Sequence, residues 1–105
     1  MRIAQAQMNP RLGDFEYNAE KILSMSELAV EQGCDLVIFP ESTLFGYLPL
    51  DMLDYDHIVE DQLKFFHSLE KKIPKGIAVL IGLISRAPKK SGKPYLNSAA
   101  LLQKG

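Results

Sequence analysis

The alternation of apolar and polar residues along the chain predicts four strands. Residues 2–8 alternate apolar or small side chains with glutamines and stop at an Asn-Pro pair, which is typical of a strand that ends in a turn. Residues 35–39 and 77–84 have fully apolar centres, as strands covered on both faces do. Residues 95–102 form a fourth candidate strand, which a lysine-rich loop joins to the third as a hairpin partner.

Two segments between these strands have the spacing of helices. The first follows Asp14, a favourable N-cap, and Gly33 provides its C-terminal stop. Its buried face is predicted to contain Phe15, Ala19, Ile22, Leu23, Ser26, Ala29 and Val30. The second begins near Asp56 and ends before Pro74. Its apolar stripe consists of Val59, Leu63, Phe66 and Leu69.

The resulting β-α-β-α-β-β order predicts an α/β fold with a largely parallel sheet. Two helices are too few to cover both faces of a four-stranded sheet whose central strands are apolar throughout. Either the helices lie one on each face and cover it poorly, or both lie on one face and the other meets something absent from this chain. We favour the second arrangement, and we expect the chain to self-associate through that face if it folds alone.

Length and composition narrow the class of protein but not its chemistry. A chain of 105 residues has the size of one small domain and excludes two complete ones. With 12 basic and 13 acidic residues, it has no overall field to attract nucleic acid or a membrane surface. No apolar run approaches the ~18 residues that span a bilayer, and the start lacks a signal-peptide pattern. A single cysteine, Cys34, excludes an internal disulfide framework and favours a cytoplasmic location.

Glu41 is the candidate catalytic residue. It follows the predicted strand at 35–39, and ligands of open α/β sheets bind at the carboxyl ends of strands. Pro40 stops the strand and stiffens the backbone beneath the carboxylate, an arrangement that suits a general base. The alternative interpretation is an acidic residue in a solvated turn. The apolar, aromatic segment that follows, 42–53, favours a pocket, because ordinary surface loops are polar.

These motifs resemble the first catalytic block of the nitrilase (carbon–nitrogen hydrolase) superfamily. The resemblance rests on Phe-Pro-Glu at 39–41, preceded by Gly-Cys-Asp-Leu-Val-Ile and followed by Gly-Tyr at 46–47. Residues 4–18 look like the family's first strand and helix, and Asn-Ser-Ala at 97–99 matches a further family position. The stretch 46–53, with Asn-Pro at 9–10, is similar to the glutaminase domains of glutamine-dependent NAD+ synthetases.

The resemblance implies an αββα sandwich and a Glu–Lys–Cys triad. Glu41 would be the general base that takes the proton of a nucleophilic cysteine, and Tyr47 would help to shape the glutamine pocket. A lysine would help to stabilise the oxyanion. The ammonia released from glutamine would pass to a separate synthetase domain that uses ATP and Mg²⁺, in a protein that is expected to be a homo-oligomer. The chain itself would hold no cofactor and no metal.

The lysine and cysteine of that triad are absent from this chain. Cys34 precedes the strand that Glu41 follows, which places the two residues roughly 15–20 Å apart. The lysines at 89, 90 and 93 lie in a polar loop and are expected to be solvated. We therefore expect residues 1–105 to be the incomplete N-terminal portion of a carbon–nitrogen hydrolase (glutaminase) domain, inactive alone. The matching sheet of the sandwich would come from later sequence.

The sequence also contains two weaker signals and is compatible with two other functions. His57 and His67 have no partners at metal-ligand spacing, and Ser-Gly-Lys at 91–93 lacks the flanking residues of a phosphate loop. A nitrilase-type amidase or carbamoyl-amide hydrolase would share the fold, and ammonia release from glutamine rather than aliphatic amides would distinguish it. A non-catalytic α/β binding or assembly module would instead be a monomer with little exposed apolar surface.

Overall fold

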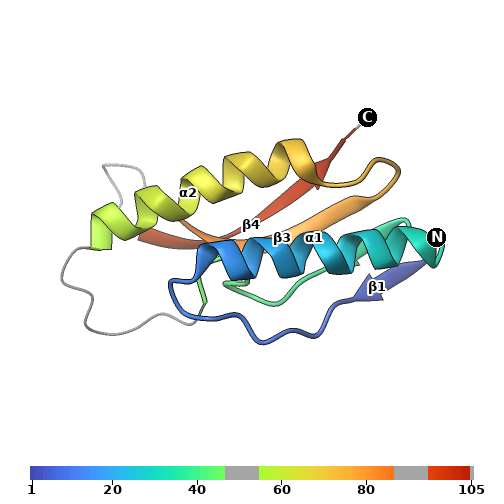
Figure 1. The fold of residues 1–105 in the computed structure, drawn as a ribbon, viewed down its shortest axis with the longest axis horizontal. Helices are drawn as coiled ribbons and strands as arrows, with labels where there is room; N and C mark the ends of the chain where they lie inside the picture. The colour runs from blue at the N-terminus through green and yellow to red at the C-terminus, as the bar shows by residue number, and fades with distance from the viewer. Residues whose placement is uncertain (47–54, 87–94, 105) are drawn as a thin grey trace.

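A computed structural model describes residues 1–46, 55–86 and 95–104, apart from the side chains of 55 and 56. The elements are β1 (Ile3–Gln5), α1 (Phe15–Glu31), β2 (Leu36–Ile38), α2 (Tyr55–Lys72), β3 (Ala78–Arg86) and β4 (Tyr95–Gln103). This order confirms the predicted β-α-β-α-β-β arrangement (Figure 1). The strands lie side by side in the order β1-β2-β3-β4, with β1, β2 and β3 parallel and β4 antiparallel to β3.

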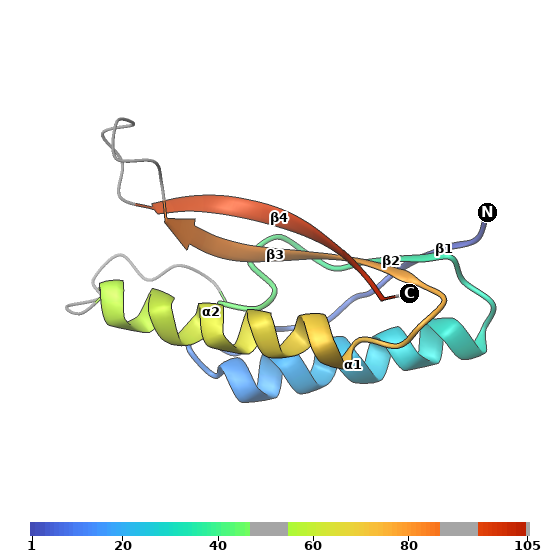
Figure 2. The same cartoon turned by 90° about the horizontal axis from the view of Figure 1, so that it is seen from above.

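Both helices lie on the same side of the sheet (Figure 2), as the shortage of helices predicted. The sheet's helix-facing side is a row of apolar side chains in register: Ala4, Val37, Val79 and Leu102. Three of these four are buried, and Val79 is fully enclosed. They pack with Ile22 of α1 and Leu69 of α2 into one core cluster. The hydrophobic layer between helices and sheet is therefore the main source of stability.

The opposite face of the sheet carries apolar side chains that the described residues leave partly uncovered. They alternate with the core positions along each strand. Leu101 is 63% exposed and Ile3 is 52% exposed. The remaining apolar members of this open face are Leu36, Ile38, Ala78, Leu80 and Ala99. The open face is the uncovered surface that the shortage of helices predicted.

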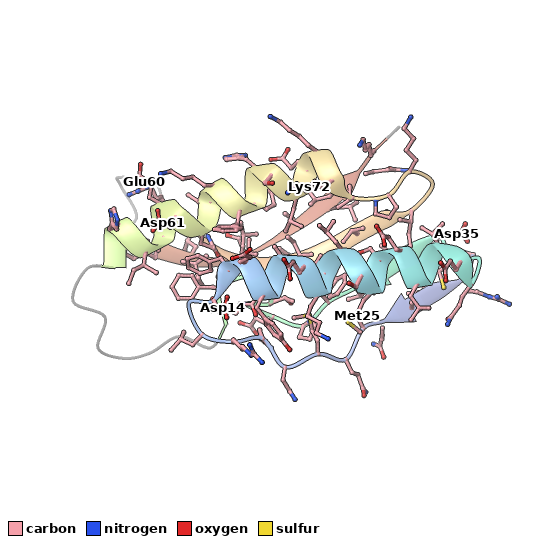
Figure 3. All side chains as sticks on the ribbon, in the orientation of Figure 1. Asp14, Met25, Asp35, Glu60, Asp61 and Lys72 are labelled. Carbon is pink, nitrogen blue, oxygen red and sulfur yellow. The ribbon has the colours of Figure 1, made fainter. Side chains whose placement is uncertain are left out.

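Helix α1 begins and ends at the predicted signals, but its buried face differs from the predicted stripe. Asp14 lies at the start of α1 (Figure 3), and its carboxylate accepts a hydrogen bond from the Tyr17 amide at 3.2 Å and caps the helix. Val30, predicted to be buried, is 36% exposed. Asn18 is fully buried instead, which a pattern of apolar residues could not predict. At the other end, the Asp35 carboxylate accepts from the Arg2 amide and ties β1 to the approach to β2.

A polar side chain of α2, that of Gln62, bonds to β3 beyond the point where β2 has ended. Gln62 is completely buried, and its amide nitrogen donates to the Ile84 carbonyl at 2.8 Å. Its side-chain oxygen accepts from the Ile84 amide, also at 2.8 Å. The Gln62 side chain thus pairs with the edge of β3 as a neighbouring strand would. Both backbone groups of Ile84 are satisfied at a position that lies inside the protein.

Substituting Gln62 by leucine is expected to destabilise the fold strongly. Leucine fills a similar volume but leaves the buried N–H and C=O of Ile84 unpaired, at about 1–3 kcal/mol for each group. Urea unfolding of the full natural chain measures the loss. Gln32→Leu is the matched control, because Gln32 is exposed at the end of α1. Equal stability of the two variants would contradict a structural role for the Gln62 amide.

Neither helix in the described part of the chain has the length and apolar character needed to cross a bilayer.

Candidate active site

Glu41 lies where the chain leaves the sheet after β2. The Phe39 amide still donates to the Leu80 carbonyl of β3 at 2.9 Å, but Pro40 has no N–H with which to continue the ladder. Glu41 is exposed and borders an open cleft of about 290 Å³ on the open face of the sheet. The cleft is lined by residues 39–41, 80–82 and 97–99. The predicted place for Glu41, at the carboxyl end of a parallel strand, is confirmed.

The segment that carries Glu41, residues 40–46, is fixed to three other parts of the fold. The Leu44 amide donates to the Gly82 carbonyl of β3 at 3.1 Å. The buried Asn18 side chain of α1 donates to the Leu44 carbonyl at 2.8 Å. The Gly13 amide donates to the Phe45 carbonyl at 3.0 Å. These bonds hold the segment as part of the folded core, so Glu41 projects from a firm support.

Side-chain packing and local turns add to this support. Leu44 and Phe45 are both fully buried, and the Phe45 ring lies 5.6 Å from that of Phe15 in a tilted arrangement. The Thr43 hydroxyl donates to the Pro40 carbonyl, and the Gly46 amide donates to the Ser42 carbonyl. The apolar character of residues 42–46 is explained by this burial, and the rest of the apolar stretch 42–53, which favoured a pocket, lies outside the described residues.

Gly46 is required by the close approach of this segment to the loop before α1. Its φ is +92°, a region that side chains rarely adopt. A Cβ at this position would lie 2.6 Å from the Leu12 Cα. The glycine of the Gly-Tyr motif therefore has a physical reason in the packing of the backbone. Tyr47, the predicted substrate-binding residue, lies outside the described residues.

Beneath Glu41, the backbone of residues 41 and 42 lies very close to Gly82 of β3. Ser42 is the only described residue other than glycine with a positive φ, +56°, a conformation that costs roughly 1–2 kcal/mol for an ordinary residue. An ideal Cβ on residue 82 would lie 2.4 Å from the Ser42 nitrogen and 3.0 Å from the Glu41 carbonyl carbon. Glycine at 82 thus lets the peptide between Glu41 and Ser42 lie directly on β3.

The remaining candidate residues lie away from Glu41. Cys34 is buried before β2, whereas Glu41 follows that strand, so the structure does not bring them together. His57 pairs with Asp61 at 3.9 Å and His67 with Glu70 at 2.8 Å, both on the surface of α2. Within the described ranges, no group of three or more His, Cys, Asp or Glu side chains is placed to hold a metal ion.

The Glu41 carboxylate makes no hydrogen bond or ion pair with any other described residue. It is therefore available to a ligand or to groups outside the described ranges. Carboxylates can accept a proton from a nucleophile when they are held within hydrogen-bond reach of it. The fold thus presents at the rim of a cleft a firmly supported carboxylate that is unpaired among the described residues, which is the arrangement that a general base needs.

Three residues that fix the Glu41 segment or the neighbouring edge of β3 were not predicted from the pattern of the sequence. Asn18 and Gln62 are polar residues on the buried faces of helices, and Gly82 interrupts an apolar strand. Of these, only Gly82 had a readable signal, since a glycine within a strand often marks a close backbone approach. Asn97 was noted only as part of a motif, yet it lines the cleft and contacts Ser42.

The chain belongs to the carbon–nitrogen hydrolase family, whose model matches residues 2–105. This agrees with the α/β fold of the described residues. Glutamine-dependent NAD(+) synthetase from Synechocystis sp. is 38% identical over 106 residues, which is 98% of this chain. The match extends over only 19% of that relative, so the chain spans about a fifth of its length.

Solved structures show the same fold. The crystal structure of a glutamine-dependent NAD(+) synthetase from Cytophaga hutchinsonii has a TM-score of 0.83 and 25% identity, over 98% of this chain and 17% of that one. An amidase from Nesterenkonia sp. has a TM-score of 0.71 and 25% identity, over 96% of this chain and 37% of that one. The predicted nitrilase-type architecture is confirmed by these neighbours.

Proposed function

We propose that this chain supplies the general base of a glutaminase, which releases ammonia from glutamine for ATP-dependent NAD+ synthesis. The observation that carries the proposal is the Glu41 carboxylate, unpaired among the described residues and held at the cleft by a segment bonded to α1 and β3. The proposal is also supported by the similarity of almost the whole chain to glutamine-dependent NAD(+) synthetases.

In this proposal Glu41 removes the proton from a cysteine thiol. The resulting thiolate attacks the side-chain carboxamide carbon of glutamine and forms a tetrahedral intermediate. Glu41 then returns the proton to the leaving nitrogen, and ammonia departs as the carbon–nitrogen bond breaks. Water, activated by the same carboxylate, hydrolyses the γ-glutamyl thioester to glutamate and restores the thiol. Every proton thus passes through one carboxylate, which explains why its support is so firm.

The cysteine and an oxyanion-stabilising lysine would come from sequence beyond residue 105. Cys34 does not meet the requirement, since it is buried before β2. We propose that residues 1–105 are the N-terminal portion of the hydrolase domain, that they are inactive alone, and that Tyr47 contributes to the glutamine pocket. ATP and Mg²⁺ would be bound by a separate synthetase domain. The open apolar face supports the expectation that these residues do not work as an isolated monomer.

Ammonia release by the full natural chain tests the proposed function. Glutamine and a series of aliphatic amides are supplied at equal concentrations, and ammonia is measured with a coupled enzyme assay. We expect kcat/KM for glutamine to exceed that for acetamide or propionamide by at least about 100-fold, since a site built to pair polar groups rejects substrates that lack them. Faster hydrolysis of the aliphatic amides would assign the chain to an amidase instead. No ammonia from any amide would overturn the proposal.

A further inference from the structure

We propose that Asn97 of β4 is a positioning residue for Glu41, acting through the Ser42 hydroxyl; this rests on the proposed role of Glu41 as general base. Asn97 borders the same cleft as Glu41. The Ser42 hydroxyl donates to its side-chain oxygen at 3.2 Å. The bond joins residues 55 positions apart and connects the segment after β2 to the far strand of the β3–β4 hairpin.

The geometry of the hairpin places Asn97 within reach of the segment. Asn97 pairs with Ile84, and Ala99 pairs with Gly82, so Asn97 and Ala99 face the same side of the sheet as Gly82. The peptide between Glu41 and Ser42 lies against Gly82 on that side. The Asn97 side chain can therefore reach across β3 and meet Ser42.

The position of the Glu41 carboxylate depends on the backbone beneath it. No other described side chain bonds to that carboxylate, so no side-chain contact in the described ranges holds it in place. Ser42, the next residue, has a φ of +56°, which is unfavourable unless its surroundings impose it. The hydrogen bond from its hydroxyl to Asn97 restrains Ser42 in this conformation. Its loss would let Ser42 relax and would swing the Glu41 side chain relative to the cleft.

The other bonds of the segment do not link Ser42 to another strand, since the Gly46 amide that donates to the Ser42 carbonyl belongs to the same segment. Asn18 and Gly82 hold the Leu44 backbone, two residues further along, and the Thr43 hydroxyl bonds to Pro40 within the same turn. The Ser42–Asn97 bond joins the residue adjacent to Glu41 to a different strand. Asn97 thus fixes the direction of the general base without touching the reacting atoms.

A double-mutant cycle in the full natural chain tests this inference. Asn97→Ala and Ser42→Ala are each expected to lower kcat for the best amide substrate by about tenfold with KM changed less than twofold, because small misplacements of a catalytic group slow the reaction. The double variant is expected to be no slower than the slower single variant, since both remove the same bond. Multiplied losses, or unchanged kcat in Asn97→Ala, would overturn the inference.

Two further variants separate positioning from folding. Ser42→Gly retains the positive φ without strain but removes the hydroxyl, so it folds readily and is expected to lose the same activity as Asn97→Ala. Ser85→Ala removes a hydroxyl pair with Ser98 on the same hairpin and is expected to retain kcat. An equal fall in kcat for Ser85→Ala and Asn97→Ala would mean that both act by destabilising the β3–β4 hairpin, and it would overturn the inference.

Amide hydrogen exchange gives a readout that does not depend on glutamine hydrolysis. We expect exchange at residues 41–44 to accelerate by at least about tenfold in Asn97→Ala and to stay unchanged in Ser85→Ala. If the wild-type chain hydrolyses no amide but this exchange pattern holds, the proposed function is wrong and the mechanical link between Asn97 and the Glu41 segment stands. Equal exchange in all three proteins would overturn the link whatever the enzyme's substrate.

Discussion

Glu41→Gln is expected to lower kcat for glutamine hydrolysis by about 10²–10⁴-fold, the range that a positioned general base contributes. Glutamine has the shape of glutamate but cannot accept the thiol proton, so the nucleophile stays protonated at neutral pH. Because the carboxylate is exposed and no other described residue bonds to it, the temperature of unfolding should change little. Initial rates of ammonia release and a thermal melt of the full natural chain check both expectations.

Glu27→Gln is the control for this substitution. Glu27 is an exposed residue of α1, and the same change of charge there should leave kcat unaltered. A Glu41→Gln variant that retains more than a tenth of the wild-type kcat would show that another group takes the proton. Loss of activity together with a large fall in the melting temperature would instead assign Glu41 a structural role.

Gly82→Ala is expected to affect both stability and activity. The added methyl group would lie 2.4 Å from the Ser42 nitrogen, and the obstructing atoms are backbone rather than the end of a flexible side chain. Either β3 or the segment with Glu41 must shift. Such overpacking costs about 1–3 kcal/mol. The same shift moves Glu41 away from its place at the cleft, so kcat should fall by at least about tenfold.

Urea unfolding and ammonia release measure the two effects of Gly82→Ala in the same protein. Ser85→Thr, which adds one methyl group to the same strand and keeps the hydroxyl, is the control. It should leave kcat near the wild-type value. If Gly82→Ala unfolds at the wild-type urea concentration and keeps its kcat, the close approach between β3 and the Glu41 segment is not a feature of the protein in solution.

The elements that the sequence predicted well are those whose signals are local. The caps of α1, the apolar centres of β2 and β3, and the proline that ends β2 all act within a few residues. The prediction that both helices lie on one side of the sheet had another basis, since two helices are too few to cover both of its faces. The place of Glu41 at a strand end could also be predicted from local signals, namely Pro40 and the strand before it.

What the sequence could not predict depends on partners far along the chain. Asn18 and Gln62 are buried because carbonyl and amide groups of distant segments need them, and no pattern of apolar residues contains that information. Asn97 meets Ser42 only because the hairpin register places it opposite Ile84, on the same side of the sheet as Gly82. Strand lengths were also overestimated for residues 2–8 and 35–39, since the ladders end where the chain turns away from the sheet.

The pairing of Gln62 with Ile84 has a consequence for how the protein avoids aggregation. β2 stops early so that Glu41 can leave the sheet, and this would leave a stretch of β3 with an unpaired edge. Such an edge is a template on which a strand from another molecule can add. The Gln62 amide occupies both groups of Ile84, and the Leu44 amide occupies the Gly82 carbonyl. The gap that makes room for Glu41, the proposed general base, is therefore closed to foreign strands.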